Sequence, residues 1–403
     1  MISTNISEKS KNWLLNFSLI FSSTIPQFGM NIVAPALPQL GNYFHSEVTS
    51  LQFVITLYLI GYAFAVLFSG VLSERFGARQ VHIWGITVFS LSSFACTQVT
   101  SFYLLLTLRF IQALCGCGIT VLSRLIIQQV YPAQKHIGII TTLALVVALS
   151  PSVAPVLGGL ILDIYDWKQI FWFLGGMGGI SLLLFCYFVP SIQKYPNNIS
   201  TISSFFNEVF HGVKQQAFRR YLVAISLVSM GQIAFLANSA YPIQINMGIS
   251  ASEYGFLLAL TAIGFVIGTQ IARIIVPQYG TQAVLLCAGI VSLLGGTAII
   301  SASYLWPNSP WSLVAPMLII MLSVGIVVPA TQAGLLRIPS AKPGYLASVF
   351  FFGQIALSTI YGMGTKSFNT DSLTLSIAVA APCLLLGGLS LFWNCSWESS
   401  SEA

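Results

Sequence analysis

Long apolar segments recur along almost the whole chain, and they restrict its possible folds more than any other feature of the sequence. Twelve of them approach or exceed the roughly 20 residues that a helix needs to cross a bilayer. Charged residues make up only 6% of the 403 residues, whereas soluble domains carry about 25%. The sequence therefore predicts an all-α membrane protein with 12 transmembrane helices. The predicted helices are 13–36, 50–72, 81–98, 102–128, 137–162, 168–190, 221–245, 254–276, 282–304, 311–335, 344–366 and 372–393.

One long polar stretch, from Ser191 to Arg220, separates the sixth apolar segment from the seventh. We therefore expect two pseudo-symmetric six-helix bundles joined by a cytoplasmic linker. Apolar residues within the linker recur at helical spacing, which fits either a short amphipathic surface helix or a partly ordered connection. The predicted parts are an N-terminal bundle at 1–193, the linker at 194–219, a C-terminal bundle at 220–396 and a cytoplasmic tail at 397–403.

The basic residues are unevenly distributed over the predicted loops, and this sets the orientation. If the N-terminus is cytoplasmic, only Lys168 and Lys366 lie outside, while Arg109 falls inside a helix. All other Lys and Arg residues then lie on the cytoplasmic side, as the positive-inside rule requires. We expect a multi-pass protein of a bacterial-type inner (plasma) membrane with both termini in the cytoplasm.

The predicted loop between the second and third helices combines glycines with three charges, in the sequence Gly70-Val-Leu-Ser-Glu-Arg-Phe-Gly-Ala-Arg79. Glycine permits a sharp turn that a Cβ atom would obstruct, so this stretch predicts a tight hydrophilic hairpin at the membrane surface. Its spacing resembles the loop between helices 2 and 3 of the major facilitator superfamily of transporters. That family loop reads Gly-x-Leu-x-Asp-Arg-x-Gly-x-Arg/Lys.

The resemblance implies roles for the charges of this loop in conformational gating. Glu74 would face the N-terminus of helix 11 near Gly344, where a helix end favours an anion, and would hold the two halves together. Arg75 and Arg79 would hold the loop and contact anionic lipid. The alternative is that these charges only anchor the loop.

The two halves also share an internal repeat. A shift of 203 residues places Gly61 and Gly77 onto Gly264 and Gly280, with matching apolar residues around them. The segment 277–280 then corresponds to 74–77. Internal repeats around a central binding site are typical of secondary transporters.

The fourth predicted helix contains Arg109 and Gln112. An arginine inside a membrane helix costs about 2.5–3.5 kcal/mol on insertion scales, so it needs a partner or a water-filled cavity. The spacing resembles the family motif Arg-x-x-Gln-Gly, with Ala113 in the glycine position. That resemblance implies a link to proton or substrate coupling, whereas the alternative is that Arg109 bonds backbone carbonyls and stabilises the bundle. We expect Gln112 to serve a different face of the helix.

The fifth predicted helix carries Pro151, Pro155, Gly158 and Gly159. Prolines kink a helix, and small residues let neighbouring helices approach closely. The pattern resembles the antiporter signature Gly-Pro-x-x-Gly-Gly. With Trp-x-x-Ile-Phe at 167–171, it is similar to drug:proton antiporters of the bicyclomycin/chloramphenicol-resistance type. The resemblance implies that this helix gates transport and seals against leakage.

The chain departs from that type at Asn31, where the relatives usually carry an aspartate. No acidic residue lies in the middle of a predicted helix, and Asp163 comes closest. All four histidines are expected at surfaces or helix ends. A proton could then be carried by Glu74, by Asp163 or by the substrate, or coupling could run through Arg109. Transport without protons is the alternative.

Several polar residues interrupt the apolar helices and should face the protein interior, because an amide or hydroxyl in lipid is costly. For each of them, helix–helix bonding and substrate contact remain alternatives. The positive charge of Arg109 favours neutral or anionic, amphipathic substrates. The candidate cavity residues are Gln27, Asn31, Tyr58, Gln112, Gln232, Asn238, Tyr241, Gln332, Gln354 and Tyr361.

The combined pattern predicts a secondary active transporter that works by alternating access, most simply a multidrug exporter driven by proton antiport. An uptake carrier or facilitator for a small metabolite or siderophore is the alternative, and a non-transporting receptor of the same fold is a third. The sequence contains no phosphate loop, zinc motif or nucleophile–base pair, so we expect no enzyme activity, cofactor, metal or nucleic-acid partner. We expect a monomer in contact with membrane lipid, and the sequence leaves the substrate and the direction of transport open.

Overall fold

The computed structural model describes residues 8–190, 213–338, 343–365 and 372–401, and within these ranges every regular element is a helix. The first half of the chain contains α1 (Glu8–Asn31), η1 (Ala34–Ala36), α2 (Leu37–Phe44), α3 (Val48–Leu51), α4 (Phe53–Phe76), α5 (Ala78–Cys96), α6 (Phe102–Gly116), α7 (Ile119–Val130), α8 (Ala133–Ile164) and α9 (Trp167–Phe188). The second half contains α11 (Gln216–Asn238), η2 (Pro242–Asn246), α12 (Ala251–Leu305), α13 (Trp311–Leu336), α14 (Pro343–Gly364) and α15 (Ser372–Ser401).

The all-helical architecture agrees with the prediction. In the described ranges, nine helices are long and apolar enough to cross a membrane. One of them, α12, is 55 residues long and consists of two arms that meet at Gly280, whose backbone is not helical. The fourth predicted helix is divided into α6 and α7. The total of 12 transmembrane helices stays a prediction, and the predicted linker helix lies outside the described residues.

Two equivalent glycines turn the chain in the two halves. Gly77, between α4 and α5, has φ 89° and ψ 137°, and Gly280 has φ 77° and ψ 169°. Positive φ of this kind is readily available only to glycine, so the same residue type is required at both turns. The two turns are 203 residues apart, which is the offset of the repeat in the sequence.

The turn at Gly77 is tighter than the predicted hairpin. The helix α4 continues to Phe76 and α5 begins at Ala78, so Gly77 alone separates them. Gly70 therefore lies inside α4, and the expectation that it forms part of a turn is wrong. Leu72, Glu74 and Arg75 are good helix formers, and they extend the helix past the end of the apolar segment.

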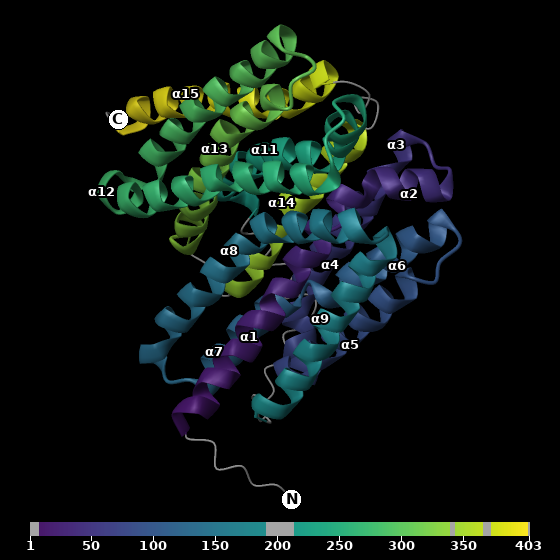
Figure 1. The fold of residues 1–403 in the computed structure, drawn as a ribbon. Coiled ribbons are helices and arrows are strands. Elements are labelled where there is room, and N and C mark those ends of the chain that lie inside the picture. The colour runs from purple at the N-terminus through teal and green to yellow at the C-terminus, as the bar shows by residue number, and fades with distance from the viewer. Residues whose placement is uncertain (1–7, 191–212, 339–342, 366–371, 402–403) are drawn as a thin grey trace, which may run out of the picture.

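The two halves lie against one another over a limited region, with α1–α9 on one side and α11–α15 on the other (Figure 1). The helices α8 and α12 pack together across this boundary, and so do α4 and α14. Phe64 on α4 and Phe352 on α14 place their ring centroids 5.7 Å apart.

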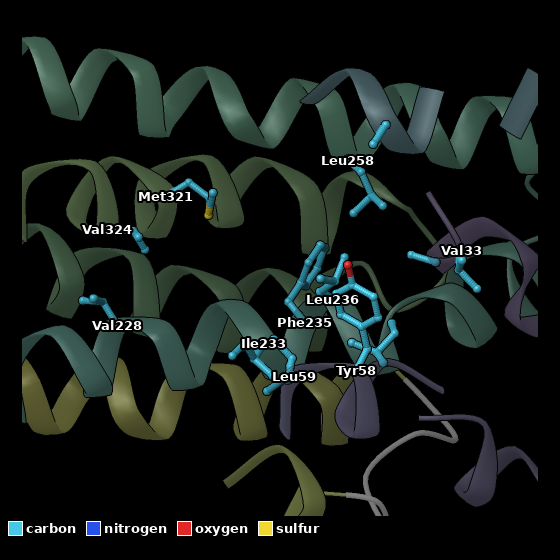
Figure 2. Close-up of a cluster of buried hydrophobic side chains, with 14 of the residues drawn as sticks. Val33, Tyr58, Leu59, Val228, Ile233, Phe235, Leu236, Leu258, Met321 and Val324 are labelled. Atoms are coloured by element: carbon cyan, nitrogen blue, oxygen red, sulfur yellow. The ribbon is translucent and has the colours of Figure 1, made fainter. Parts of the chain in front are cut away.

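Buried apolar side chains from both halves form one continuous cluster between them (Figure 2). Val33, Tyr58 and Leu59 come from the first half. The labelled contributors from the second half are Val228, Ile233, Phe235, Leu236, Leu258, Met321 and Val324. The centre of the molecule is therefore lined mainly by hydrocarbon and aromatic groups.

Candidate functional site

Arg109 lies at the centre of the first half, with a fully buried side chain (0% exposed). Its Nη2 donates to the carbonyl oxygen of Gly29 at 2.8 Å, and its Nη1 donates to Oε1 of Gln112 at 2.6 Å. A longer bond of 3.4 Å joins Nε to the carbonyl oxygen of Val54. Every nitrogen of the guanidinium group thus has an acceptor, which offsets the cost of burying the charge.

Aromatic rings complete the surroundings of this guanidinium group. Its central carbon lies 4.2 Å from the ring centroid of Tyr58 and 5.9 Å from that of Phe171, both within the range of cation–π attraction. The Tyr58 hydroxyl donates to the carbonyl oxygen of Pro26 at 2.9 Å. Arg109 therefore joins α1, α4, α6 and α9 into one unit.

Gln112 belongs to the same network, and the prediction that it serves a different face is wrong. Residues three apart on a helix are neighbours, so Gln112 can accept from Arg109 on its own helix. Its Nε2 donates to the hydroxyl of Ser93 on α5 at 2.6 Å. Both Gln112 and Tyr58 are fully buried in this cluster, which makes them partners of Arg109 in this conformation.

No carboxylate neutralises Arg109 among the residues whose side chains are described. The described acidic side chains are all exposed on the surface: Glu47, Glu74, Asp163, Asp166 and Glu253. Asn31, where the family resemblance leads us to expect an aspartate, is 6% exposed and donates through Nδ2 to the carbonyl oxygen of Gln27 at 2.8 Å. The interior of the first half therefore carries positive charge without an acidic partner in the described part of the chain.

The remaining cavity candidate of the first half, Gln27, is half-buried and donates through Nε2 to the Tyr62 hydroxyl at 3.2 Å. This bond links α1 to α4 and involves none of the acceptors of Arg109. Tyr62 was not predicted as a site residue, because a single tyrosine in an apolar segment gives no distinctive signal.

Candidates in the second half form hydrogen bonds within and between helices. Asn238 donates through Nδ2 to the Ala234 carbonyl oxygen at 2.9 Å and to the Thr365 hydroxyl at 3.2 Å. Gln354 donates to the Ser229 hydroxyl at 2.8 Å. The Tyr361 hydroxyl donates to the Ala378 carbonyl oxygen at 2.6 Å. Three other candidates are half-buried and have no described side-chain hydrogen bond: Gln232, Tyr241 and Gln332.

The two arginines beside the turn at Gly77, Arg75 and Arg79, make different contacts. Arg79 donates through Nε to the Val189 carbonyl oxygen at 3.1 Å and through Nη2 to that of Cys186 at 3.4 Å. Arg79 thus caps the C-terminal end of α9, where a helix favours a cation. Arg75 is exposed, 5.2 Å from the ring centroid of Phe76. The predicted contact of Glu74 with the helix end near Gly344, which is the start of α14, stays a prediction, because the side chains of residues 339–345 lie outside the described part of the chain.

Small residues on α8 make close contact with both halves. A Cβ atom added to Gly158 would collide with the carbonyl oxygen of Ile32, and one added to Gly159 would collide with that of Ala251 on α12. In return, a Cβ atom on Gly255 would collide with the carbonyl oxygen of Pro155. The predicted close approach of helices at this motif is therefore present. Pro151 and Pro155 both lie within the continuous helix α8.

A hydrogen bond also joins the two halves near the contact between α8 and α12. Gln244 in η2 donates through Nε2 to the carbonyl oxygen of Pro35 in η1, at 3.1 Å. Together with the α8–α12 contact, this bond joins the halves at the end where η1 and η2 lie.

His82 lies near the start of α5, as expected, but its side chain is not at a surface. It is fully buried, its Nε2 lies 3.2 Å from the Ser22 hydroxyl, and its ring stacks on Phe185 with centroids 3.9 Å apart. This face of α5 is buried in the core of the first half together with the apolar residues around His82. His45 is exposed and His136 is half-buried, whereas His211 lies outside the described residues.

A cavity of about 710 Å³ lies between α1 and α8, towards the ends where α1 begins and α8 begins. Trp13, Phe17 and Phe21 stack along one side of α1, with successive ring centroids 5.4 and 5.7 Å apart. Trp13, Phe17 and Phe21 line this cavity, together with Lys135 of α8.

A model of the family described as "Major Facilitator Superfamily" matches residues 19–360. The chain belongs to the major facilitator superfamily. It is therefore a multi-pass membrane transporter of small molecules and not an enzyme.

Curated relatives in this superfamily cover nearly the whole chain at low identity. A bicyclomycin resistance protein homolog of Haemophilus influenzae is 22% identical, over 98% of this chain and 100% of its own. A chloramphenicol resistance protein of Pseudomonas aeruginosa is 24% identical, over 96% of this chain and 93% of its own.

Solved structures agree with the superfamily fold. A mutant of the nucleoside transporter NupG has a TM-score of 0.73 at 14% identity, covering 94% of this chain and 99% of its own. A mutant of the peptide transporter POT in complex with sulfate has a TM-score of 0.76 at 14% identity, covering 93% of each chain. At this identity, the likeness concerns the fold.

Proposed function

We propose that this transporter exports small amphipathic molecules from the cytoplasm by proton antiport, through alternating access. The observation that carries the proposal is the packing of α8 at the antiporter-like motif, where Gly158 and Gly159 admit the backbones of the segment after α1 and of α12. The names of the two curated relatives, which refer to resistance to bicyclomycin and chloramphenicol, support drug export. Their identity to this chain is low, so they support a class of substrate rather than one compound.

The closed end of the molecule fits one state of an alternating-access cycle. In the predicted orientation, with both termini cytoplasmic, η1 and η2 lie at the outer side of the inner membrane. The contact between Gly159 and Ala251 then seals the outer side, and the cavity beside Trp13 lies towards the cytoplasm. Pro151, Pro155, Gly158 and Gly159 would form the outer gate, while Gly70, Glu74, Arg75, Gly77 and Arg79 would control the cytoplasmic side.

The chemistry between the halves favours amphipathic molecules that are neutral or anionic. The shared cluster of Tyr58, Phe235 and Leu236 is apolar, and no described acidic side chain is buried. A cationic drug would therefore lack a counter-charge in the described interior. Polar contacts to substrate would come from half-buried amides and hydroxyls. We assign this role to Gln27, Gln232, Tyr241, Gln332 and Gln354.

Drug accumulation in cells tests this proposal. Cells of a strain that lacks its own multidrug exporters are loaded with radiolabelled chloramphenicol, with and without the transporter. Expression of the transporter should lower the steady-state content of chloramphenicol, and a protonophore should restore it. Unchanged accumulation over a panel that includes bicyclomycin would contradict drug export.

An uptake carrier or facilitator is the second candidate, and Asn31 favours it. An asparagine does not titrate, and its amide is already bonded to the Gln27 carbonyl oxygen. Proton coupling would then depend on the exposed carboxylates of Glu74 and Asp163, on the substrate or, indirectly, on Arg109. The accumulation experiment separates the candidates, because an uptake carrier raises the cellular content of its substrate.

A further inference from the structure

Arg124 on α7 is a second arginine in the first half, and its environment is the opposite of that of Arg109. Its side chain is half-buried, and its Nε is shielded from solvent yet has no hydrogen-bond acceptor among the described residues. The guanidinium group makes no ion pair with any carboxylate in the described part of the chain, since those carboxylates are exposed elsewhere. A buried donor without an acceptor is costly, so its retention calls for an explanation.

Arg124 lies on the face of α7 that is less buried in the first half. Val121 and Arg124 are half-buried and Gln128 is exposed, whereas Ser123 and Ile127, on the other side of the helix, are fully buried. Residues 121, 124 and 128 share a face of a helix because they are three and four apart. This face is therefore less covered by the first half than the face that carries Ser123 and Ile127.

Two polar side chains from neighbouring helices lie on the same side. The helices α4 and α7 pack together, and the charge of Arg124 acts on Tyr62 of α4, which packs against the buried cluster shared by the halves. Gln27 of α1 donates to the Tyr62 hydroxyl at 3.2 Å. Because this hydroxyl oxygen accepts from Gln27, its own proton remains available for donation to a ligand. An arginine fork and a tyrosine hydroxyl form a set of donors, which suits an oxygen anion.

We propose that Arg124, Tyr62 and Gln27 form a binding site for the anionic group of an amphipathic molecule. Arg124 contacts the anion, Tyr62 donates a second hydrogen bond, and Gln27 positions Tyr62. The apolar part of the molecule lies against the hydrocarbon surfaces between the halves. This proposal rests on the proposed export of amphipathic molecules and assigns to this site the recognition of those that carry a carboxylate, sulfonate or phosphate group. The same chemistry could come from a free substrate or from a lipid headgroup.

A matched pair of fluorescent probes tests the site. The dye 1-anilinonaphthalene-8-sulfonate carries an anionic sulfonate, and N-phenyl-1-naphthylamine has the same ring skeleton without it. Binding of both is measured on purified protein in phosphatidylcholine nanodiscs, with protein-free nanodiscs as the blank. The variants are Arg124→Gln, Arg124→Lys and, as a charge-matched control, Arg273→Gln, whose side chain is exposed on α12.

The expected result is selective for the anion. Arg124→Gln should weaken binding of the sulfonated dye about tenfold or more, which corresponds to at least about 1.4 kcal/mol. Binding of the neutral dye should change less than about twofold, because its contacts are apolar. Arg124→Lys should retain part of the sulfonate affinity, and Arg273→Gln should affect neither dye. Unchanged sulfonate binding in Arg124→Gln, or an equal loss for both dyes, would overturn the proposal.

Two further comparisons complete the test. One distinguishes a lipid headgroup from a free anion, and the other distinguishes failure of the anion site from failure of the export proposal. In nanodiscs with phosphatidylglycerol, loss of the Arg124-dependent dye signal would assign the site to a lipid headgroup, and a preserved signal would assign it to a free anion. Failure of the cells to export chloramphenicol would remove the export proposal, yet the equilibrium binding difference between the dyes would still stand. Export without any Arg124-dependent anion preference would leave export intact and remove the anion site.

Discussion

The two arginines of the first half differ in the acceptors available to them. Arg109 is closed in by two carbonyl oxygens, the Gln112 amide and two rings, and its side chain is fully buried. Arg124 is half-buried, and its Nε has no acceptor among the described residues. A buried guanidinium group whose nitrogens all have acceptors fits a positioning role. A buried donor without an acceptor calls for an explanation, and our proposal for Arg124 is a ligand.

Replacement of Arg109 by alanine should therefore impair folding and transport together. The change leaves the carbonyl oxygen of Gly29 and the amide oxygen of Gln112 buried without a donor. Each unsatisfied group lowers the free energy of unfolding by about 1–3 kcal/mol. Thermal unfolding of the purified variant in detergent should occur at a markedly lower temperature, and transport should fall in parallel. The exposed Arg273→Ala serves as control. Loss of transport at normal thermal stability would instead give Arg109 a direct part in coupling.

The burial of Arg109 was predictable, because a charge within an apolar segment has to find acceptors. Its main acceptor was not, since the Gly29 carbonyl oxygen lies 80 residues away in the chain and nothing in its sequence marks it. The burial of His82 was not predictable, because its position near a predicted helix end says little about which face is covered.

At the level of helices, the sequence was a good guide to their existence and a weaker guide to their ends. Apolar length predicted the helices, since a bilayer allows few other structures. Gly77 and Gly280 were predictable as equivalent turns from the repeat offset. The end of α4 was not, because Leu72, Glu74 and Arg75 favour a helix whether or not lipid surrounds them.

The contact of α8 with α12 gives a prediction at the same scale. Gly159→Ala places a methyl group against the carbonyl oxygen of Ala251, and overpacking of this kind costs about 1–3 kcal/mol. The state closed at the end where η1 and η2 lie should become less populated, and transport should slow by about tenfold, which corresponds to about 1.4 kcal/mol. The matched control is Gly176→Ala on α9, where an added Cβ atom meets no other atom within 4 Å. Normal transport by Gly159→Ala would show that α8 and α12 need not approach so closely.

At the scale of the whole molecule, two bundles meet at an apolar centre and close at the end where η1 and η2 lie. That arrangement suits alternating access, because a ligand between the halves is reached from one side at a time. The fold was predictable from hydropathy and the repeat. The energy source was not, because the expected helix-1 carboxylate is replaced by Asn31 and the described carboxylates are all exposed.

The most direct test of proton-driven export is chloramphenicol uptake by proteoliposomes with an imposed pH gradient. Chloramphenicol is uncharged, so a pH gradient alone does not trap it. With an acidic interior and an alkaline exterior, protons that leave through an antiporter should drive accumulation of the drug above its external concentration, and a protonophore should abolish this accumulation. Equal drug levels with and without the gradient, at the same protein content, would contradict proton antiport.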